Sequence, residues 1–238
     1  MAWRDLACLG LGRNRSSKGG MRAADLFAVA FVRASDSAAT SFGYRVPQAQ
    51  QVADWLVALP NATRELIGGG MEKGIVLLDG WTFNLTGLPA SKGPYALFSR
   101  NSGQGVPSPN WEYFFQIAEF VRVREALPDS LSVGFEDGLM DVSVRRAREL
   151  LWYVEVKPRA SQIAPLLVAM NSYAAAVPLD RPDRGNDPLR KSKILVRHRP
   201  PSLSIVGGEE RRHFDVQYDE DSFGLIERTD GPEVALRL

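Results

Sequence analysis

Three side chains of complementary chemistry, Asp141, Glu155 and Lys157, stand at positions that an antiparallel strand pair would bring together. Two facing carboxylates repel one another unless a cation lies between them, and the lysine supplies only one positive charge. A hard divalent cation with oxygen ligands is the natural neutraliser. The spacing therefore predicts a carboxylate–carboxylate–lysine site suited to a divalent metal. The plainer interpretation is a solvated strand face with a cross-strand ion pair.

The strand expected at 150–157 carries the second carboxylate and the lysine. Its side chains alternate between two faces, and both faces carry apolar residues, so the strand is too apolar for an exposed edge. This favours the metal site over the plain ion pair. Pairing Val142 with Val154 keeps one apolar face continuous. The same pairing places Asp141 opposite Glu155, at roughly 5 Å between Cβ atoms.

The turn before these strands is predicted by the pair Asp137-Gly138, because a two-residue type I′ turn needs positive φ at both central positions. In that register Gly134 faces Asp141 and leaves open space beside the carboxylate. The same register gathers the apolar side chains of the hairpin on the opposite face, namely Leu131, Val133, Phe135, Met140, Val142 and Val144.

An aspartate on the second strand of a meander, followed by the strand segment Glu155-Val156-Lys157, resembles the PD-(D/E)xK phosphodiesterase superfamily, the restriction-endonuclease-like nucleases. That family also has a helix before the meander and a helix after it, which are expected here at 111–126 and 160–177. The resemblance covers roughly residues 109–200 and implies a mixed central β-sheet flanked by helices. Met140 stands where the motif has its proline.

The resemblance implies a role for each site residue. Asp141, Glu155 and the backbone carbonyl of Val156 would ligate Mg²⁺, with Mn²⁺ as a substitute. Lys157 would position or deprotonate the attacking water and offset phosphate charge, while the metal acts as a Lewis acid on the scissile phosphate. Glu119, from the preceding helix, would complete the metal shell directly or through water.

Further residues extend this expectation. Glu112 is the alternative to Glu119, because both border the apolar stripe of their helix and the sequence fixes the helix rotation only loosely. Gln162 resembles the polar residue that many members of the family carry just past the lysine, although such a residue is also common at a helix N-terminus. Basic side chains would contact phosphates at the margins of the cleft, and the candidates are Arg145, Arg146, Arg148, Lys191 and Lys193.

The whole chain is interpreted as an α/β protein with three parts. Residues 1–21 form an N-terminal segment expected to be flexible, residues 22–105 an α+β extension with two helices and a hairpin, and residues 106–238 the restriction-endonuclease-like core. The core is expected to add strands near 193–198 and a C-terminal hairpin between 203 and 218.

Glycine and histidine patterns argue against two other chemistries. Gly68-Gly69-Gly70 is expected to end the helical part of the extension, and no glycine run in the chain has the spacing of a nucleotide-binding loop. His198 and His213 lack metal-ligand spacing and are expected to be structural.

Bulk composition predicts an intracellular protein. The 238 residues include 29 basic and 28 acidic side chains, so the net charge of +1 gives no global field toward nucleic acid. The single cysteine, Cys8, excludes a disulfide framework and a multi-thiolate zinc site, as is typical of a reducing compartment. No apolar run approaches the roughly 20 residues that span a bilayer. We therefore expect a cytoplasmic protein without a membrane partner.

Together these patterns predict a metal-dependent endonuclease that hydrolyses phosphodiester bonds, in DNA rather than RNA. Restriction, mobile-element defence, repair and recombination are all suitable contexts. A homodimer or a larger complex would suit an enzyme that cuts both strands. Two alternatives stay open: a catalytically inactive nucleic-acid-binding or protein-interaction module of the same fold, and a protein whose working surface is the N-terminal extension.

Overall fold

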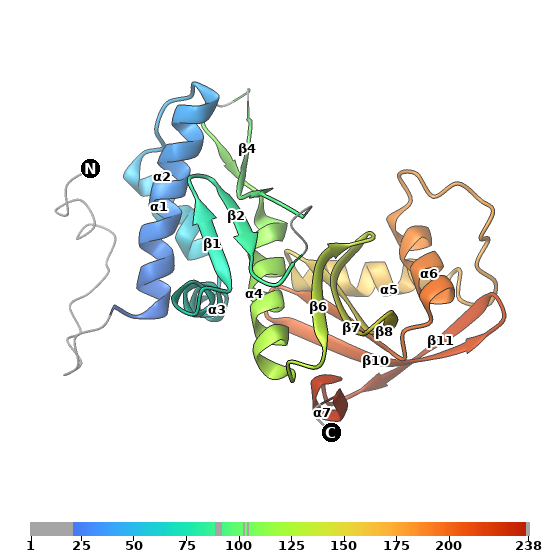
Figure 1. Ribbon diagram of the computed structural model, residues 1–238. Helices are drawn as coiled ribbons and strands as arrows, with labels where there is room; N and C mark the ends of the chain where they lie inside the picture. The colour runs from blue at the N-terminus through green and yellow to red at the C-terminus, as the bar shows by residue number, and fades with distance from the viewer. Residues whose placement is uncertain (1–20, 89–91, 102, 104, 237–238) are drawn as a thin grey trace. The chain divides into compact units, whose positions relative to one another are not determined.

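A computed structural model describes residues 21–88, 92–101, 103 and 105–236 (Figure 1). The N-terminal segment expected to be flexible lies outside the described residues except for Met21, and Cys8 also lies outside them. The chain divides into two compact units between Val121 and Arg122. This division falls inside a helix, farther along the chain than the soft boundary expected near residue 105.

The first unit begins with three helices, where the sequence predicted two. They are α1 Ala23–Phe42, α2 Ala49–Ala58 and α3 Asn61–Glu72. The prediction that Gly68-Gly69-Gly70 ends the helical part was wrong, because these glycines lie inside α3. A Cβ at Gly68 would stand 1.9 Å from the carbonyl oxygen of Ala23. Close packing of α3 against the start of α1 therefore outweighs the low helix propensity of glycine.

Short strands and an aromatic core complete the first unit. Its three-stranded antiparallel sheet consists of β1 Val76–Asp79, β2 Thr82–Leu85 and β3 Tyr95–Ala96, while β4 Phe98–Ser99 pairs with β5 Ser108–Pro109. The β1–β2 pair confirms the predicted hairpin. Phe31 contacts Phe27, Phe98 and Phe114 with ring centroids 5.3–5.7 Å apart, so buried aromatic packing holds this unit together.

The second unit is built on a six-stranded sheet with the order β11-β10-β9-β8-β7-β6. Its strands are β6 Ser132–Asp137, β7 Met140–Arg146, β8 Glu149–Lys157, β9 Ser202–Gly207, β10 Glu210–Asp219 and β11 Ser222–Arg228. Neighbouring strands are antiparallel except for the parallel pair β8 and β9. The mixed α/β fold with a central mixed sheet is confirmed, and so is the C-terminal hairpin, which is formed by β9 and β10.

The described residues from 111 onward form four α-helices. They are α4 Trp111–Ala126, which precedes the sheet and contains the division between the units, α5 Ile163–Asn171, α6 Asp187–His198 and the short α7 Glu233–Leu236. The helix predicted at 111–126 is confirmed. The one predicted at 160–177 is shorter, since a 3₁₀ turn at Ala160–Gln162 leads into α5. None of the helices in the described part of the chain has both the length and the apolar content to cross a membrane.

The prediction of a strand at 193–198 was wrong, because this segment is the second half of α6. Its start carries helix signals that the strand prediction overlooked. The Asn186 side chain accepts a hydrogen bond from the Leu189 N–H at 3.0 Å, and Pro188 lies in the first turn. The two helices α5 and α6 supply the crossover that a parallel strand pair requires.

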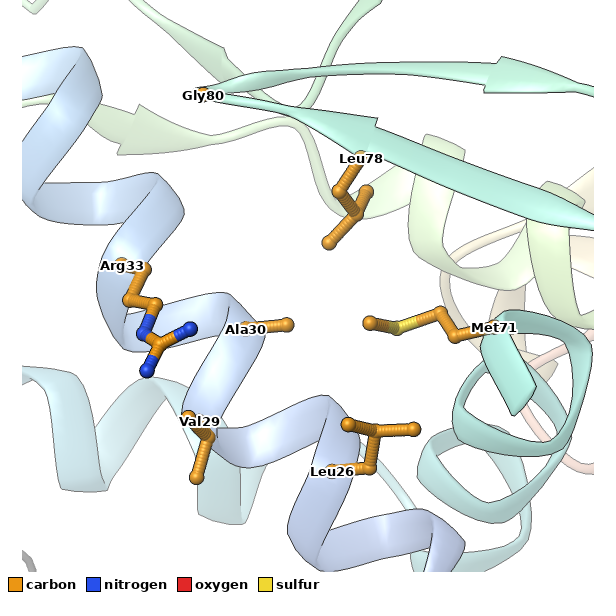
Figure 2. A pocket seen from close by; sticks show the side chains of 7 residues that line it. All are labelled: Leu26, Val29, Ala30, Arg33, Met71, Leu78 and Gly80. Carbon is orange, nitrogen blue, oxygen red and sulfur yellow. The ribbon is translucent and has the colours of Figure 1, made fainter. Parts of the chain in front are cut away.

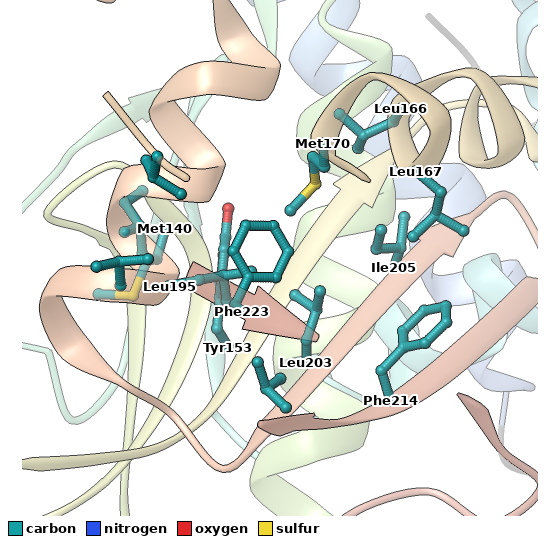
Figure 3. Packing of buried hydrophobic residues seen from close by; sticks show 14 of the residues in the cluster. Met140, Tyr153, Leu166, Leu167, Met170, Leu195, Leu203, Ile205, Phe214 and Phe223 are labelled. Carbon is teal, nitrogen blue, oxygen red and sulfur yellow. The ribbon is translucent and has the colours of Figure 1, made fainter. Parts of the chain in front are cut away.

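The helices α5 and α6 pack on one face of the sheet, which we call the α6 face. Buried side chains from the strands, such as Tyr153, Leu203 and Phe214, meet Met170 of α5 and Leu195 of α6 there (Figure 3). Alternation along β8 places Glu155 and Lys157 on the same face as Tyr153. The candidate site therefore lies at the margin of a hydrophobic core.

The β6–β7 register differs from the prediction by two residues. Positive φ angles at Gly138 (61°) and Leu139 (79°) place the turn one residue later than predicted. Gly134 consequently faces Ser143 rather than Asp141. A two-residue shift leaves every side chain on its predicted face, which is why the apolar pattern alone could not fix the register.

Candidate functional site

Asp141 and Glu155 are brought together by the β7–β8 pair. The predicted pairing of Val142 with Val154 is confirmed, and Asp141 is the next residue of β7. Asp141 is only 7% exposed, and its Oδ2 atom accepts a hydrogen bond from the Val156 backbone N–H at 2.7 Å. The Asp141 carboxylate is therefore fixed against β8, beside the two residues predicted to share its metal.

Glu155 is the most enclosed of the charged residues of the site, with 1% exposure. Its Oε1 atom lies 2.8 Å from the Lys157 ammonium, and its Oε2 atom lies 2.7 Å from the Lys191 ammonium. The Tyr153 hydroxyl also donates to Oε2. A buried carboxylate is thus compensated by two cations and one hydroxyl, as burial of charge requires.

Two residues of α6 complete the cluster. Asp187 and Lys191, one helical turn apart, lie 3.7 Å from each other, and Asp187 also lies 3.3 Å from Lys157. The Lys191 ammonium donates to the Leu139 carbonyl at 3.2 Å and so ties α6 to the β6–β7 turn. From the sequence, Lys191 was predicted only as a phosphate contact, and Asp187 was not identified as a site residue. Their i, i+4 spacing on a helix was the available signal.

The electrostatics of the cluster are dominated by burial. Burial raises the pKa of Asp141 well above its ordinary range, and the neighbouring Glu155 carboxylate raises it further. Burial would lower the pKa of Lys157 and of Lys191, yet the pKa of each is raised because Glu155 and other carboxylates surround it. The site therefore holds more negative charge than it accommodates easily when it contains only its own side chains.

The donor set suits a hard divalent cation. No group of three histidine, cysteine or acidic side chains is gathered as a ready metal cage among the described residues. The Glu155 Oε1 atom is buried, and its partner is the Lys157 ammonium at 2.8 Å. The Asp141 and Glu155 carboxylates nevertheless offer oxygen ligands of the kind that Mg²⁺ prefers, an ion that takes few protein ligands and keeps several waters.

Glu119 and Glu112, the two alternatives on α4 that were expected to join the site, differ in their burial. Glu119 is buried on α4, at 1% exposure, in the first unit, whereas Glu112 is exposed at the start of the same helix. Gln162 is exposed, and its Oε1 atom accepts the Arg159 backbone N–H at 3.1 Å. Gln162 therefore closes the 3₁₀ turn before α5, as the structural interpretation of this residue anticipated.

The basic residues expected to contact phosphates fall into two groups. Arg146 and Arg148 are exposed at the β7–β8 turn, and the Arg145 guanidinium pairs with Asp137 at 2.9 Å. Lys193 is 4% exposed, lies 3.7 Å from the Asp183 carboxylate and donates to the Arg181 carbonyl. Like Lys191, it is an interior cation in this structure. Only the turn arginines stand on the surface.

The opposite face of β8 carries a chain of hydrogen-bonded polar side chains, and we call it the Trp152 face. The Trp152 indole N–H donates to Ser204 Oγ at 2.8 Å, and Ser204 Oγ lies 2.6 Å from Nδ1 of His213. The Arg122 guanidinium lies 5.8 Å from the Trp152 ring centroid and pairs with Glu233 at 2.8 Å. His213 has a hydrogen-bonding role here, consistent with the structural role expected for it.

The first unit contains a shallow apolar groove of about 290 Å³. Leu26, Met71 and Leu78 point toward its centre, and Arg33 lies at its margin (Figure 2). Its lining includes no carboxylate, histidine or cysteine. The groove lining therefore offers none of the side chains commonly used as a general base or as a metal ligand.

No protein-family model, curated protein or solved structure matches this chain.

Proposed function

We propose that the protein is a metal-dependent nuclease that hydrolyses phosphodiester bonds at the cluster formed by Asp141, Glu155 and Lys157. The observation that carries the proposal is the burial of two carboxylates, Asp141 and Glu155, at facing positions of β7 and β8 beside Lys157. Like charges buried side by side are unfavourable, and the pKa of Asp141 is raised well above its ordinary range. A divalent cation from solvent would neutralise both carboxylates.

The strand topology supports the finer assignment to a restriction-endonuclease-like core. The order of elements is a helix, a three-stranded antiparallel meander, a helical crossover and a strand parallel to the last strand of the meander. The helix before the meander and the helical segment after it are what the resemblance to PD-(D/E)xK enzymes implies. Asp141 on the second meander strand and Glu155-Val156-Lys157 on the third stand at the motif positions of that arrangement.

The residues of the cluster divide the work of such an enzyme. Asp141, Glu155 and the Val156 carbonyl would hold Mg²⁺ or Mn²⁺, which when bound supplies a Lewis acid for the scissile phosphate. Lys157 lies between Glu155 at 2.8 Å and Asp187 at 3.3 Å, so its ammonium is held in place to orient a water and to offset phosphate charge. The Val156 N–H holds the Asp141 carboxylate in position.

DNA is the proposed substrate, with RNA the less favoured one. The exposed Arg146 and Arg148 at the β7–β8 turn are the proposed surface contacts to phosphates, which would make binding fall steeply with salt. A cytoplasmic location and a role in restriction, mobile-element defence, repair or recombination remain part of this proposal. A homodimer or larger complex would supply the second cut in a duplex.

Cleavage assays test the proposal directly. Plasmid, linear duplex, single-stranded DNA and RNA are incubated with Mg²⁺ or Mn²⁺ and, separately, with EDTA. Wild type is compared with Asp141→Ala and Lys157→Ala, and Asp215→Asn serves as the control because Asp215 pairs with Arg228 on the surface of β10. We expect metal-dependent cutting by wild type and the control only.

Two results would contradict the nuclease. If well-folded wild type cut nothing on the panel but bound DNA in a salt-dependent way, the non-catalytic binding module would replace it. If cutting occurred equally in Asp141→Ala, Lys157→Ala and wild type, the activity would belong to another site or to a contaminant.

A further inference from the structure

Lys191 supplies a positive charge beside the Glu155 carboxylate, where a metal ion would supply one. It does not belong to the sequence motif. Its ammonium lies 2.7 Å from Glu155 Oε2, on the opposite oxygen from Lys157, and the residue is 5% exposed. It also lies 6.0 Å from the Tyr153 ring centroid and donates to the Leu139 carbonyl. Asp187, at 3.7 Å, is its fourth neighbour. The Glu155 carboxylate contributes most to offsetting the desolvation of this buried lysine.

The net charge of the cluster indicates a second role for Lys191. With every group ionised, the carboxylates of Asp141, Glu155 and Asp187 exceed the two ammonium groups by one negative charge. A divalent cation would reverse the sign to one net positive charge. A phosphodiester carries one negative charge and would bring the loaded site to neutrality. Without Lys191 the loaded site would already be neutral and would attract the substrate less.

We propose that Lys191 is an exchangeable counter-ion of Glu155, which leaves Glu155 when a divalent cation binds and then serves as a cation for the substrate phosphate. This inference rests on the proposed function and names how the site passes from its metal-free to its metal-bound state. Lys191 remains attached to the Leu139 carbonyl and to Asp187, so its release from Glu155 requires no unfolding of α6. Lys191 is thus a positioning and substrate-binding residue of the site.

The matched control is Lys193, two residues further along α6. Both lysines are buried, with 5% and 4% exposure, but Lys193 pairs with Asp183 and not with Glu155. Lys191→Met and Lys193→Met each remove one interior cation from the same helix. A purely structural role for Lys191 would make the two variants behave alike toward a metal.

Calorimetric titration with Mn²⁺ alone, without nucleic acid, provides the readout. We expect Lys191→Met to bind Mn²⁺ about tenfold more tightly than wild type, because the competing ammonium is removed. A tenfold change in the dissociation constant corresponds to a modest gain in binding free energy. Lys193→Met should bind Mn²⁺ as wild type does. Equal affinities in folded Lys191→Met and wild type would overturn the exchange while leaving the metal site intact. A wild type that binds no Mn²⁺ would instead overturn the proposed function itself.

A measurement on the unmodified chain protects this test against a variant that fails to fold. In protein labelled with ¹⁵N-lysine, the ammonium signals of the buried Lys191 and Lys193 are followed while Mg²⁺ is added. We expect the Lys191 signal to shift and its exchange with water to accelerate, while the Lys193 signal stays in place. A Lys191 ammonium that is unchanged at saturating Mg²⁺ would overturn the proposal.

Discussion

The two faces of β8 bury polar groups in opposite ways. On the Trp152 face, Trp152, Ser204 and His213 form a chain in which each group has a partner at 2.6–2.8 Å. On the α6 face, Asp141 and Glu155 are also buried, but they are acidic, and Glu155 is held by ion pairs with Lys157 and Lys191. The same strand therefore supports a hydrogen-bonded polar chain on one side and a cluster of buried charges on the other.

This difference indicates which face is built for a ligand. A hydrogen-bonded chain stabilises the fold without any addition from solvent. A buried carboxylate with a raised pKa, as at Asp141, reduces stability until a cation compensates it, which is typical of functional sites. Substitutions on the two faces should therefore affect stability and activity in opposite senses.

The largest expected effect separates the faces by activity. Glu155→Gln keeps the shape of the side chain but removes the charge that would hold the metal, so cleavage should fall by about 100-fold or more. Ser204→Ala, on the Trp152 face, should leave the rate within about threefold of wild type. Initial rates on the substrate that wild type cuts best, at saturating Mg²⁺, measure both. A Ser204→Ala variant as slow as Glu155→Gln would remove the functional distinction between the faces.

The second effect reverses the comparison and concerns stability. Ser204→Ala removes the acceptor of the Trp152 indole N–H and the partner of His213 Nδ1 in a fully buried place. The free energy of unfolding should drop by about 2 kcal/mol, the usual cost of leaving a buried polar group unpaired. Urea unfolding of the metal-free proteins measures it. A loss below about 0.5 kcal/mol would show that water or a rearranged side chain replaces the hydroxyl.

The third effect is a gain in stability on the α6 face. Asp141→Asn keeps an oxygen for the Val156 N–H but removes a buried negative charge beside Glu155. We expect metal-free Asp141→Asn to be about 1 kcal/mol more stable than wild type at pH 7 while losing metal-dependent cleavage. An exposed control, Asp215→Asn, should not be stabilised. A less stable Asp141→Asn would mean that the lysines more than compensate for the burial of the Asp141 carboxylate.

The gain from Asp141→Asn should depend on pH with a definite sign. The pKa of Asp141 is higher in the folded protein than the ordinary value of 3.8, so the folded state holds the proton more tightly than the unfolded state. This carboxyl therefore costs stability above its folded-state pKa, and the cost disappears as pH falls through that pKa toward 3.8. The stability difference between variant and wild type should shrink accordingly as pH is lowered from 7. A difference that grows on acidification would contradict the raised pKa.

The smallest expected effect lies at the margin of the Trp152 face. Arg122 and Glu233 form an ion pair at 2.8 Å, with side chains 20% and 18% exposed. A double-mutant cycle with Arg122→Met and Glu233→Gln should give a coupling of about 0.5–1 kcal/mol, the range for partly screened pairs. Thermal unfolding at low and high salt would show whether the coupling weakens with ionic strength, as a surface pair requires.

The sequence by itself determined the strands and the faces of the site. Strict alternation along β8 correctly placed Glu155 and Lys157 on one side, and the apolar match of Val142 with Val154 correctly set the β7–β8 register. These features are local, since side-chain alternation has a period of two and neighbouring strands are joined by short turns. The helix at 111–126 is also a local feature, and its apolar stripe at helical spacing predicted it.

Only the tertiary structure decided what surrounds the two carboxylates. The β6–β7 register slipped by two residues without changing any face, because Asp137 is held in the strand by Ser143 and Arg145, both at 2.9 Å. Asp187 and Lys191 reach Glu155 and Lys157 from a helix about thirty residues away, which no local pattern reveals. Periodicity tells which side of an element a residue occupies, whereas the element that packs against that side depends on the whole chain.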